Sequence, residues 1–221
     1  MKHSKKVWYA PNKHEAYGEE EIKAVEQCLR DGWLAGFGPR TVEFEEKIAK
    51  EFGKKYGVFV NSGSSACLLS LAALDLPKGT KVLTPALTFS TTLAPIIQLG
   101  YVPVFIDSNL TSYVPDIDDI IEAITDDIKV IMIPNLIGNK PDWKKLKDEL
   151  FRINRSDIYL IEDSADTVTY TKESDVSTTS FYASHVITAG GMGGMVMFND
   201  EKHVKRALMY RDWGRIGDNS E

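Results

Sequence analysis

The sequence predicts an α/β fold of three layers, with a mainly parallel β-sheet between two layers of helices. Short runs rich in β-branched and aromatic residues alternate with longer segments whose apolar residues recur at helical spacing. This alternation is typical of crossover units that build a parallel sheet. Several short runs are continuously apolar, as expected of strands covered on both faces. With 221 residues, 43% of them hydrophobic, the chain is long enough to bury a substantial core.

The predicted elements follow one another along most of the chain. Strands are expected at residues 57–60, 81–84, 102–106, 129–134, 158–161, 178–182 and 195–198. Helices are expected at residues 19–30, 41–52, 64–75, 91–99, 117–124, 143–151 and 201–212, and proline or glycine lies near several of their ends. The sequence shows no repeat, low-complexity tract or linker.

The composition restricts the partners. Acidic residues outnumber basic ones, 32 to 26, and the net charge of -6 argues against binding of duplex nucleic acid, which needs a positively charged face. No segment approaches the length of a membrane span, and no sustained apolar run follows the basic first residues as in a secretory signal. We therefore expect no membrane association. Cys28 and Cys67 both fall in helical apolar patterns, which indicates reduced core thiols and no metal site. Reduced thiols are typical of the cytoplasm, so we expect a cytoplasmic location.

Two segments carry residues suited to ligand binding. Residues 61–66 (NSGSSA) follow a predicted strand and open a helix, so Gly63, the serine hydroxyls and the free amides could bind an anion such as phosphate. Residues 158–163 (IYLIED) form a buried type of strand that ends in carboxylates. Since ligands gather at the carboxyl ends of strands in open α/β sheets, Asp163 would point into a site and could pair with a protonated ring nitrogen. Read alone, each is better explained as an ordinary cap or strand end.

A third segment, residues 180–194 (SFYASHVITAGGMGG), completes an ordered set. Together the three segments resemble the DegT/DnrJ/EryC1/StrS family of sugar aminotransferases, and residues 32–34 (GWL), 38–39 (GP) and 44–45 (FE) extend the resemblance over nearly the whole chain. The resemblance implies the aspartate-aminotransferase fold (fold type I) and pyridoxal 5'-phosphate (PLP) or pyridoxamine 5'-phosphate (PMP) as cofactor.

The resemblance also implies roles for individual residues. Gly63, Ser64 and Ser180 would hold the cofactor phosphate, and Asp163 would pair with the pyridine nitrogen. Phe89 would stack on the cofactor ring, because aromatic rings favour offset stacking with an electron-poor heterocycle. Without the resemblance, Phe89 would be interpreted as a core phenylalanine.

His185 stands where the aminotransferases of this family carry the lysine that tethers the cofactor, and no lysine lies between Lys172 and Lys202. Asp166 lies where they usually carry glutamine or histidine near the ring hydroxyl, so the resemblance implies that Asp166 also binds the cofactor. One branch, the 3-dehydratases of nucleotide-linked 4-keto-6-deoxyhexoses, shares this histidine together with the motifs EDxxD and RDWGR, found here at residues 162–166 and 211–215. The resemblance therefore favours C3 dehydration with His185 as the acid and base, a role that imidazole suits near neutral pH.

The resemblance implies a nucleotide sugar as substrate, glutamate as a candidate amino donor, and a homodimer with shared sites. An aminotransferase that uses a lysine from elsewhere and a noncatalytic remnant of the fold are the alternatives. Complete members are longer and end with a small C-terminal domain. We therefore expect residues 1–221 to form only the PLP/PMP-binding large domain, and the isolated chain to have little or no activity.

Overall fold

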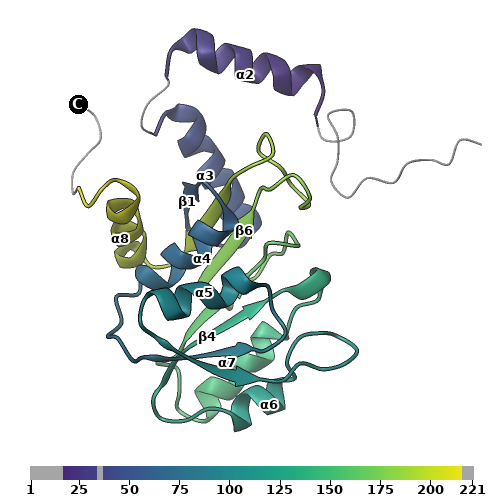
Figure 1. The fold of residues 1–221 in the computed structure, drawn as a ribbon, viewed down its shortest axis with the longest axis vertical. Coiled ribbons are helices and arrows are strands. Elements are labelled where there is room, and N and C mark those ends of the chain that lie inside the picture. Colours follow the sequence, from purple (N-terminus) through teal and green to yellow (C-terminus); the bar gives the residue numbers. More distant parts are fainter. Residues whose placement is uncertain (1–16, 34–36, 216–221) are drawn as a thin grey trace, which may run out of the picture.

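A single seven-stranded sheet forms the centre of the computed structural model, which describes residues 17–33 and 37–215 (Figure 1). The strands lie in the order β1-β7-β6-β5-β4-β2-β3. Only β7 runs antiparallel to its neighbours, so the predicted mainly parallel sheet is confirmed. The strand bounds are β1 Tyr56–Val60, β2 Lys81–Pro85, β3 Val102–Ile106, β4 Ile128–Pro134, β5 Tyr159–Asp163, β6 Val176–Ser180 and β7 Gly194–Phe198.

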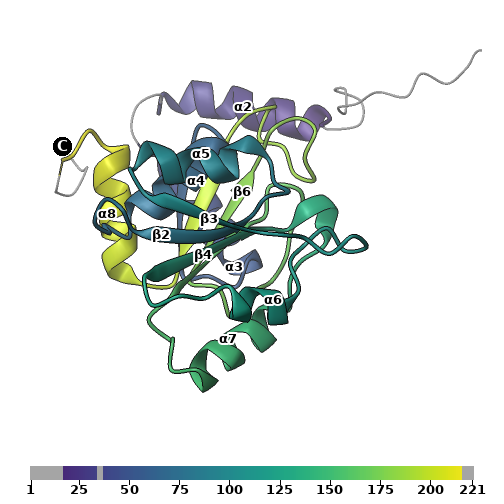
Figure 2. The ribbon, with the colours of Figure 1, turned by 60° about the horizontal axis from the view of Figure 1, so that its bottom comes forward.

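Helices cover both faces of the sheet, which confirms the three layers (Figure 2). One layer contains α4, α5 and α8, and the other contains α3, α6 and α7. The helix α2 has no buried residue and lies outside these layers (Figure 1). The helix bounds are α2 Glu19–Asp31, α3 Pro39–Glu51, α4 Gly63–Ala72, α5 Ser90–Gln98, α6 Ile117–Glu122, α7 Trp143–Arg152 and α8 Glu201–Arg211, with a short 3-10 helix at Leu136–Gly138.

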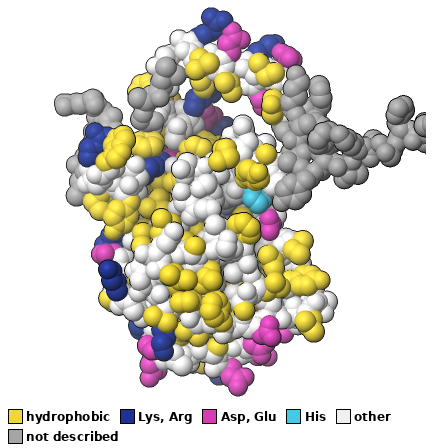
Figure 3. Space-filling model, in the orientation of Figure 1, with side chains coloured by type: hydrophobic (Ala, Val, Ile, Leu, Met, Phe, Trp, Pro, Cys, Tyr) yellow, Lys and Arg dark blue, Asp and Glu magenta, His cyan; other side chains and the backbone are white. Residues whose placement is uncertain are grey.

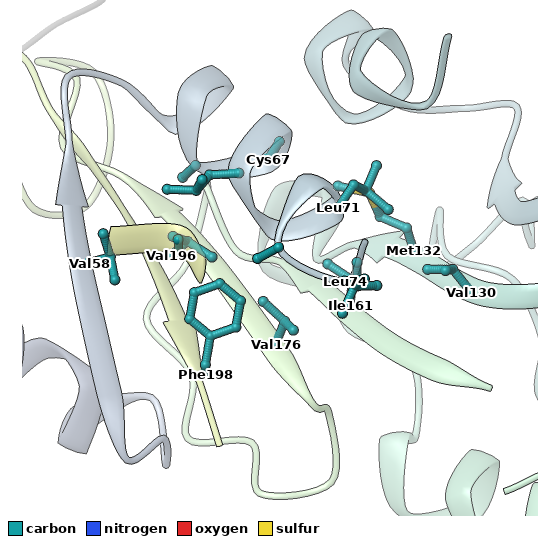
Figure 4. Packing of buried hydrophobic residues seen from close by; sticks show 14 of the residues in the cluster. Val58, Cys67, Leu71, Leu74, Val130, Met132, Ile161, Val176, Val196 and Phe198 are labelled. Carbon is teal, nitrogen blue, oxygen red and sulfur yellow. The ribbon is translucent and has the colours of Figure 1, made fainter. Parts of the chain in front are cut away.

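Neighbouring residues of each strand divide between two apolar cores. Ile161 of β5 packs beneath α4 together with Val176 and Phe198 (Figure 4). Leu160 instead packs beneath α6 and α7. This division follows from the strand geometry, in which successive side chains point to opposite faces. Complete burial of a large apolar side chain contributes about 1.5–3 kcal/mol, so the two cores hold the strand ends in fixed positions.

The predicted ends of some strands and helices differ from the observed ones, because interactions outside the regular hydrogen-bond pattern determine where an element begins or ends. The strand predicted at residues 178–182 is β6, which ends at Ser180 because the Phe181 amide instead donates to Gly193 O, at 2.9 Å. The helix predicted from residue 41 begins at Pro39, a first-turn position that suits proline because its missing N–H would have no helical partner. Both cysteines have free thiols, but only Cys67 is buried, so the prediction that Cys28 is a core thiol is wrong.

The buried amine of Lys54 should make the free energy of unfolding depend on pH in the alkaline range. Burial lowers the pKa of Lys54 from 10.5 to about 8. Between these values the unfolded chain binds a proton that the folded chain has released, so stability rises with pH across this window. We expect Lys54→Met to remove a rise of up to about 3 kcal/mol, measured by urea unfolding. The exposed Lys55→Met is the control, and an equal rise in wild type and Lys54→Met would contradict this assignment.

Candidate active site

The predicted site residues gather at one edge of the sheet, where the parallel strands have their carboxyl ends. Asp163 ends β5, Ser180 ends β6, and Phe89 follows the end of β2 at the start of α5. Gly63 opens α4 just after β1. The arrangement follows from the crossover topology, because each helix returns the chain to begin the next parallel strand at the opposite edge. We call this edge the candidate site.

The first turn of α4 packs directly against the end of β6. A Cβ atom added to Gly63 would lie 2.8 Å from Ser180 Cβ, so no larger residue fits without movement. The Ser62 hydroxyl caps the helix by accepting a hydrogen bond from the Ser65 amide at 3.1 Å. The first amides of a helix lack helical acceptors and carry partial positive charge. These amides, the exposed Ser64 and the neighbouring Ser180 hydroxyl can therefore bind an anion together.

Asp163 is a buried carboxylate held by hydroxyl groups. Thr92 Oγ1 donates to Asp163 Oδ2 at 2.8 Å, and Thr178 Oγ1 donates to Asp163 Oδ1 at 3.2 Å. Burial raises the pKa of Asp163, and among the described residues no cationic side chain opposes this effect. A buried carboxylate without a cation is costly, so Asp163 is suited to a ligand that brings a protonated ring nitrogen.

Phe89 presents an exposed ring beside this carboxylate. The Thr92 amide donates to Phe89 O at 3.0 Å, so Phe89 lies one helical turn from the hydroxyl that binds Asp163. The Phe89 side chain is 69% exposed, and its interpretation as a core phenylalanine is therefore wrong. An exposed aromatic face next to a buried carboxylate provides a surface on which a heterocycle can stack.

His185 and Asp166 lie in contact at the same edge. His185 Nδ1 is 3.3 Å from Asp166 Oδ1. Figure 3 shows a histidine and an acidic side chain side by side on one face of the molecule. Because Asp166 follows Asp163 by three residues, this contact brings His185 to the edge that contains Asp163.

Several residues that support the site were not predicted from the sequence. Thr92 and Thr178 bind Asp163, and Cys67 Sγ lies 3.5 Å from Thr178 Oγ1 beneath the same carboxylate. Strand periodicity could have identified Thr178, because it lies two residues before Ser180 and points to the same face. Nothing in the local sequence connects Thr92 or Cys67 to Asp163, since these residues meet only through packing of α4 and α5 on the sheet.

Glu162 and Asp163 are the last two residues of β5, but Glu162 has a different role. Glu162 is fully buried and accepts hydrogen bonds from Asn135 Nδ2, Thr171 Oγ1 and Ser177 Oγ at 2.7, 2.9 and 2.8 Å. Consecutive strand residues point to opposite faces, so Glu162 holds the loop after β5 from the face opposite to Asp163.

The arginines of the RDWGR motif are engaged by the protein itself. Arg211 pairs with Glu45, donates to Phe59 O at 3.1 Å and stacks 3.4 Å from the centroid of the Phe37 ring. Arg215 pairs with Asp212 at 2.7 Å. The Arg211 contacts connect α8 to α3 and β1 and so give this arginine a structural role, whereas the Arg215 pair is local to the end of α8.

Metal-binding clusters and membrane-spanning helices are both absent from the described residues. Across residues 17–33 and 37–215, no group of three or more His, Cys, Asp or Glu side chains is arranged to hold a metal ion. In the same part of the chain, no helix has both the length and the apolar character needed to cross a membrane.

The close contact between Gly63 and Ser180 gives a testable prediction. We expect Gly63→Ala to lower the affinity of the protein for PMP by about tenfold, because the new methyl group must displace Ser180 from the predicted anion-binding position. Gly18→Ala is the control, since its nearest neighbour would be Glu21 Oε2 at 3.8 Å. Fluorescence titration measures both affinities, and equal values in the two variants would contradict the predicted role.

The fold is that of an α/β protein whose candidate ligand-binding residues lie at the carboxyl ends of parallel strands. The chain belongs to the DegT/DnrJ/EryC1/StrS aminotransferase family, whose model matches residues 15–220. The predicted family is thus confirmed, and so is the predicted fold, because solved aminotransferase structures share it.

Three relatives illustrate the similarity. The lipopolysaccharide biosynthesis protein RfbH of Salmonella typhimurium is 34% identical over 220 residues, covering 93% of this chain and 49% of that protein. The GDP-4-keto-6-deoxy-D-mannose 3-dehydratase of Escherichia coli O55:H7 is 34% identical over 212 residues, covering 88% and 53%. A solved GDP-4-keto-6-deoxymannose-3-dehydratase with a trapped PLP-glutamate geminal diamine matches with a TM-score of 0.83 and 30% identity, covering 95% and 55%. The chain spans about half the length of these relatives.

Proposed function

We propose that this chain is the cofactor-binding large domain of an enzyme that uses PLP or PMP to remove the C3 hydroxyl group of a nucleotide-linked 4-keto-6-deoxyhexose. The observation that carries the proposal is the position of His185. It lies at the same edge as the buried Asp163 and in contact with Asp166. The sequence resemblance implies that the family's aminotransferases carry a lysine at this position. The similarity to 3-dehydratases supports the same reaction.

The residues at the candidate site fit the cofactor. The close packing of Gly63 on Ser180 leaves the first amides of α4 and the Ser64 hydroxyl to hold a phosphate. Asp163 would pair with the protonated pyridine nitrogen, which supplies the cation that this buried carboxylate lacks among the described residues. Phe89 would cover one face of the ring.

The chemistry divides between the cofactor and the chain. When bound, PMP supplies an amine that condenses with a ketone and a ring that accepts electrons. Asp163 keeps that ring protonated, because its carboxylate stabilises the positive nitrogen. His185 would take up a proton at Nε2 and return it to the departing hydroxyl oxygen, so one imidazole would serve as base and then as acid.

The full-length protein tests this proposal directly. Incubation with PMP and GDP-4-keto-6-deoxymannose, the sugar named for two of its relatives, should give a 3-deoxy sugar that mass spectrometry detects. Other nucleotide-linked 4-keto-6-deoxyhexoses are tested in parallel. Absence of deoxygenation with all of them would overturn the proposal.

An aminotransferase is the second candidate, because the family model describes that activity. It would require a lysine from another part of the protein to tether PLP. Borohydride reduction followed by peptide mapping would locate such a lysine in the wild-type protein, whereas the dehydratase proposal expects none. A noncatalytic remnant would bind neither PLP nor PMP in a titration.

Exposed apolar side chains around the site support the proposal of a homodimer, and the PLP-glutamate geminal diamine trapped in a solved relative supports the proposal of glutamate as amino donor. Leu87, Tyr182, Val186 and Met192 surround the edge with exposed fractions of 48, 49, 68 and 59%. Exposed apolar patches of this kind mark interaction surfaces, and a second copy of the chain would cover this one.

The free thiols of Cys28 and Cys67 support the proposal of a cytoplasmic location.

A further inference from the structure

The contact between Asp166 and His185 joins two short turns that leave neighbouring strands. Asp166 lies three residues beyond the end of β5, and His185 lies five residues beyond the end of β6. Since β5 and β6 are hydrogen-bonded parallel neighbours, their carboxyl ends are adjacent and the two turns face each other. His185 Nδ1 lies 3.3 Å from Asp166 Oδ1, just beyond the usual N–H···O hydrogen-bond range of about 2.7–3.2 Å, so a small rotation of the Asp166 side chain would form the bond.

Hydrogen bonds to the sheet hold the turn that contains Asp166. The Ala165 amide donates to Asp163 Oδ1 at 3.3 Å, which connects this turn to the buried carboxylate. Ser164 O accepts from Thr179 Oγ1 at 3.0 Å, and the Ser164 amide donates to Thr178 O at 2.8 Å. The Asp166 carboxylate thus extends from a fixed backbone, although its side chain remains 46% exposed.

The turn that contains His185 is held in a similar way. The His185 amide donates to Tyr182 O at 2.9 Å, and the Tyr182 amide donates to Ser180 Oγ at 3.3 Å. The Tyr182 ring meets the imidazole edge to face, with centroids 6.1 Å apart and planes at 67°. The His185 side chain is only 22% exposed, so few orientations are open to the imidazole ring.

We propose that Asp166 is a positioning residue that selects the tautomer of His185. In the neutral imidazole one ring nitrogen carries the proton and the other carries the free lone pair. In this proposal Asp166 accepts a hydrogen bond from Nδ1–H of His185, which leaves the lone pair on Nε2. This inference rests on the proposed function for the use of that lone pair as a base, but the contact itself involves only residues of this chain.

The pairing also distinguishes Asp166 from a residue that contacts only the cofactor. A carboxylate that binds Nδ1–H orients the base before any ligand arrives, so its effect is present in the protein without cofactor. A carboxylate that contacts only the ring hydroxyl has no effect on the imidazole of the unliganded chain. The tautomer of His185 therefore separates the two roles.

The experiment is histidine-selective 15N labelling and NMR of the ring nitrogens, at a pH where the imidazole is neutral and without cofactor. The His185→Asn variant identifies the His185 signals. We expect the Nδ1–H tautomer to dominate in the wild type, and Asp166→Ala to lower the ratio of Nδ1–H to Nε2–H by about tenfold, since a charge-assisted hydrogen bond is lost. Asp166→Asn, which keeps an acceptor without charge, should lie between them, and the exposed Asp126→Ala should equal the wild type.

A ratio that Asp166→Ala leaves unchanged would overturn the proposal. Weaker PMP binding in that same variant would then indicate that Asp166 contacts the cofactor instead. In the full-length protein, Asp166→Ala should lower kcat for deoxygenation by about tenfold to a hundredfold with little change in KM, because it alters the base and not the binding of substrate. A tautomer shift in a protein that deoxygenates no sugar would support the pairing and reject the proposed reaction, so the two failures are distinguishable.

Discussion

Under the proposed C3 dehydration, replacing His185 with asparagine is expected to lower the rate of 3-deoxy sugar formation about 10³-fold. The expectation follows from the loss of the group that moves the proton, since general acid and base catalysis contributes about 10²–10⁴-fold. Asparagine is similar in size to imidazole and keeps an acceptor for neighbouring donors, but it does not titrate. The measurement is the rate of 3-deoxy sugar formation at saturating PMP, with PMP affinity determined separately by titration.

A second histidine provides the control for this prediction. His203 lies buried on α8 against the rings of Tyr159 and Phe198, at the edge of the sheet opposite to the candidate site. We expect His203→Asn to lower stability but to preserve the rate per folded molecule. Equal rates in the wild type and in His185→Asn would exclude His185 as the acid and base.

The His185→Lys variant tests the same position without any need for substrate. A lysine amine at this point should form a covalent bond with the aldehyde of PLP, as the family's aminotransferases do at the corresponding position. We expect a PLP-modified peptide that contains position 185 after borohydride reduction, detected by mass spectrometry. The wild-type chain, treated identically, should give no adduct at this position, and absence of an adduct in the variant would place His185 away from the cofactor.

Replacing Asp163 with asparagine is expected to have opposite effects on cofactor binding and on stability. The affinity for PMP should fall by about tenfold to a hundredfold, because the buried carboxylate no longer stabilises a protonated pyridine nitrogen. The protein without cofactor should become more stable by about 1–2 kcal/mol, because an uncompensated buried charge is removed. Titration and urea unfolding measure the two effects.

The stability gain expected for Asp163→Asn should depend on pH. Burial raises the pKa of Asp163 above 3.8, its ordinary value. The folded chain then holds a proton that the unfolded chain has released, so stability falls as pH rises from 3.8 through the raised pKa. The advantage of Asp163→Asn should therefore be largest near neutral pH and should disappear below the ordinary pKa of the carboxyl group.

Asp175→Asn is the matched control for Asp163→Asn. Burial also raises the pKa of Asp175, and its carboxylate accepts a hydrogen bond from the Leu160 amide at 2.8 Å. Asp175 precedes β6 and therefore lies at the edge opposite to the candidate site. We expect Asp175→Asn to keep the wild-type affinity for PMP, and a loss of affinity as large as that of Asp163→Asn would contradict a specific role for Asp163.

Local sequence patterns were sufficient to predict the sheet and most of its helices. Continuous apolar runs indicated the buried strands, and β4 and β5 lie where such runs occur. Errors occurred at the ends of helices and strands, because contacts with residues distant in the sequence determine where these elements end. The strand β5 extends to Asp163 although its last residues are charged, because hydroxyl groups from α5, β6 and the loop after β5 bind the two carboxylates.

The sequence by itself determined the order of strands and helices along the chain, the family, and the residue types available at each strand end. It could do so because periodicity and motif spacing are local properties. Only the tertiary structure decided that Asp163 is bound by Thr92 and Thr178, that Glu162 faces the opposite side, and that Asp166 meets His185. These contacts depend on the lateral order of the strands and on the packing of helices across the sheet, which bring together residues far apart in the chain.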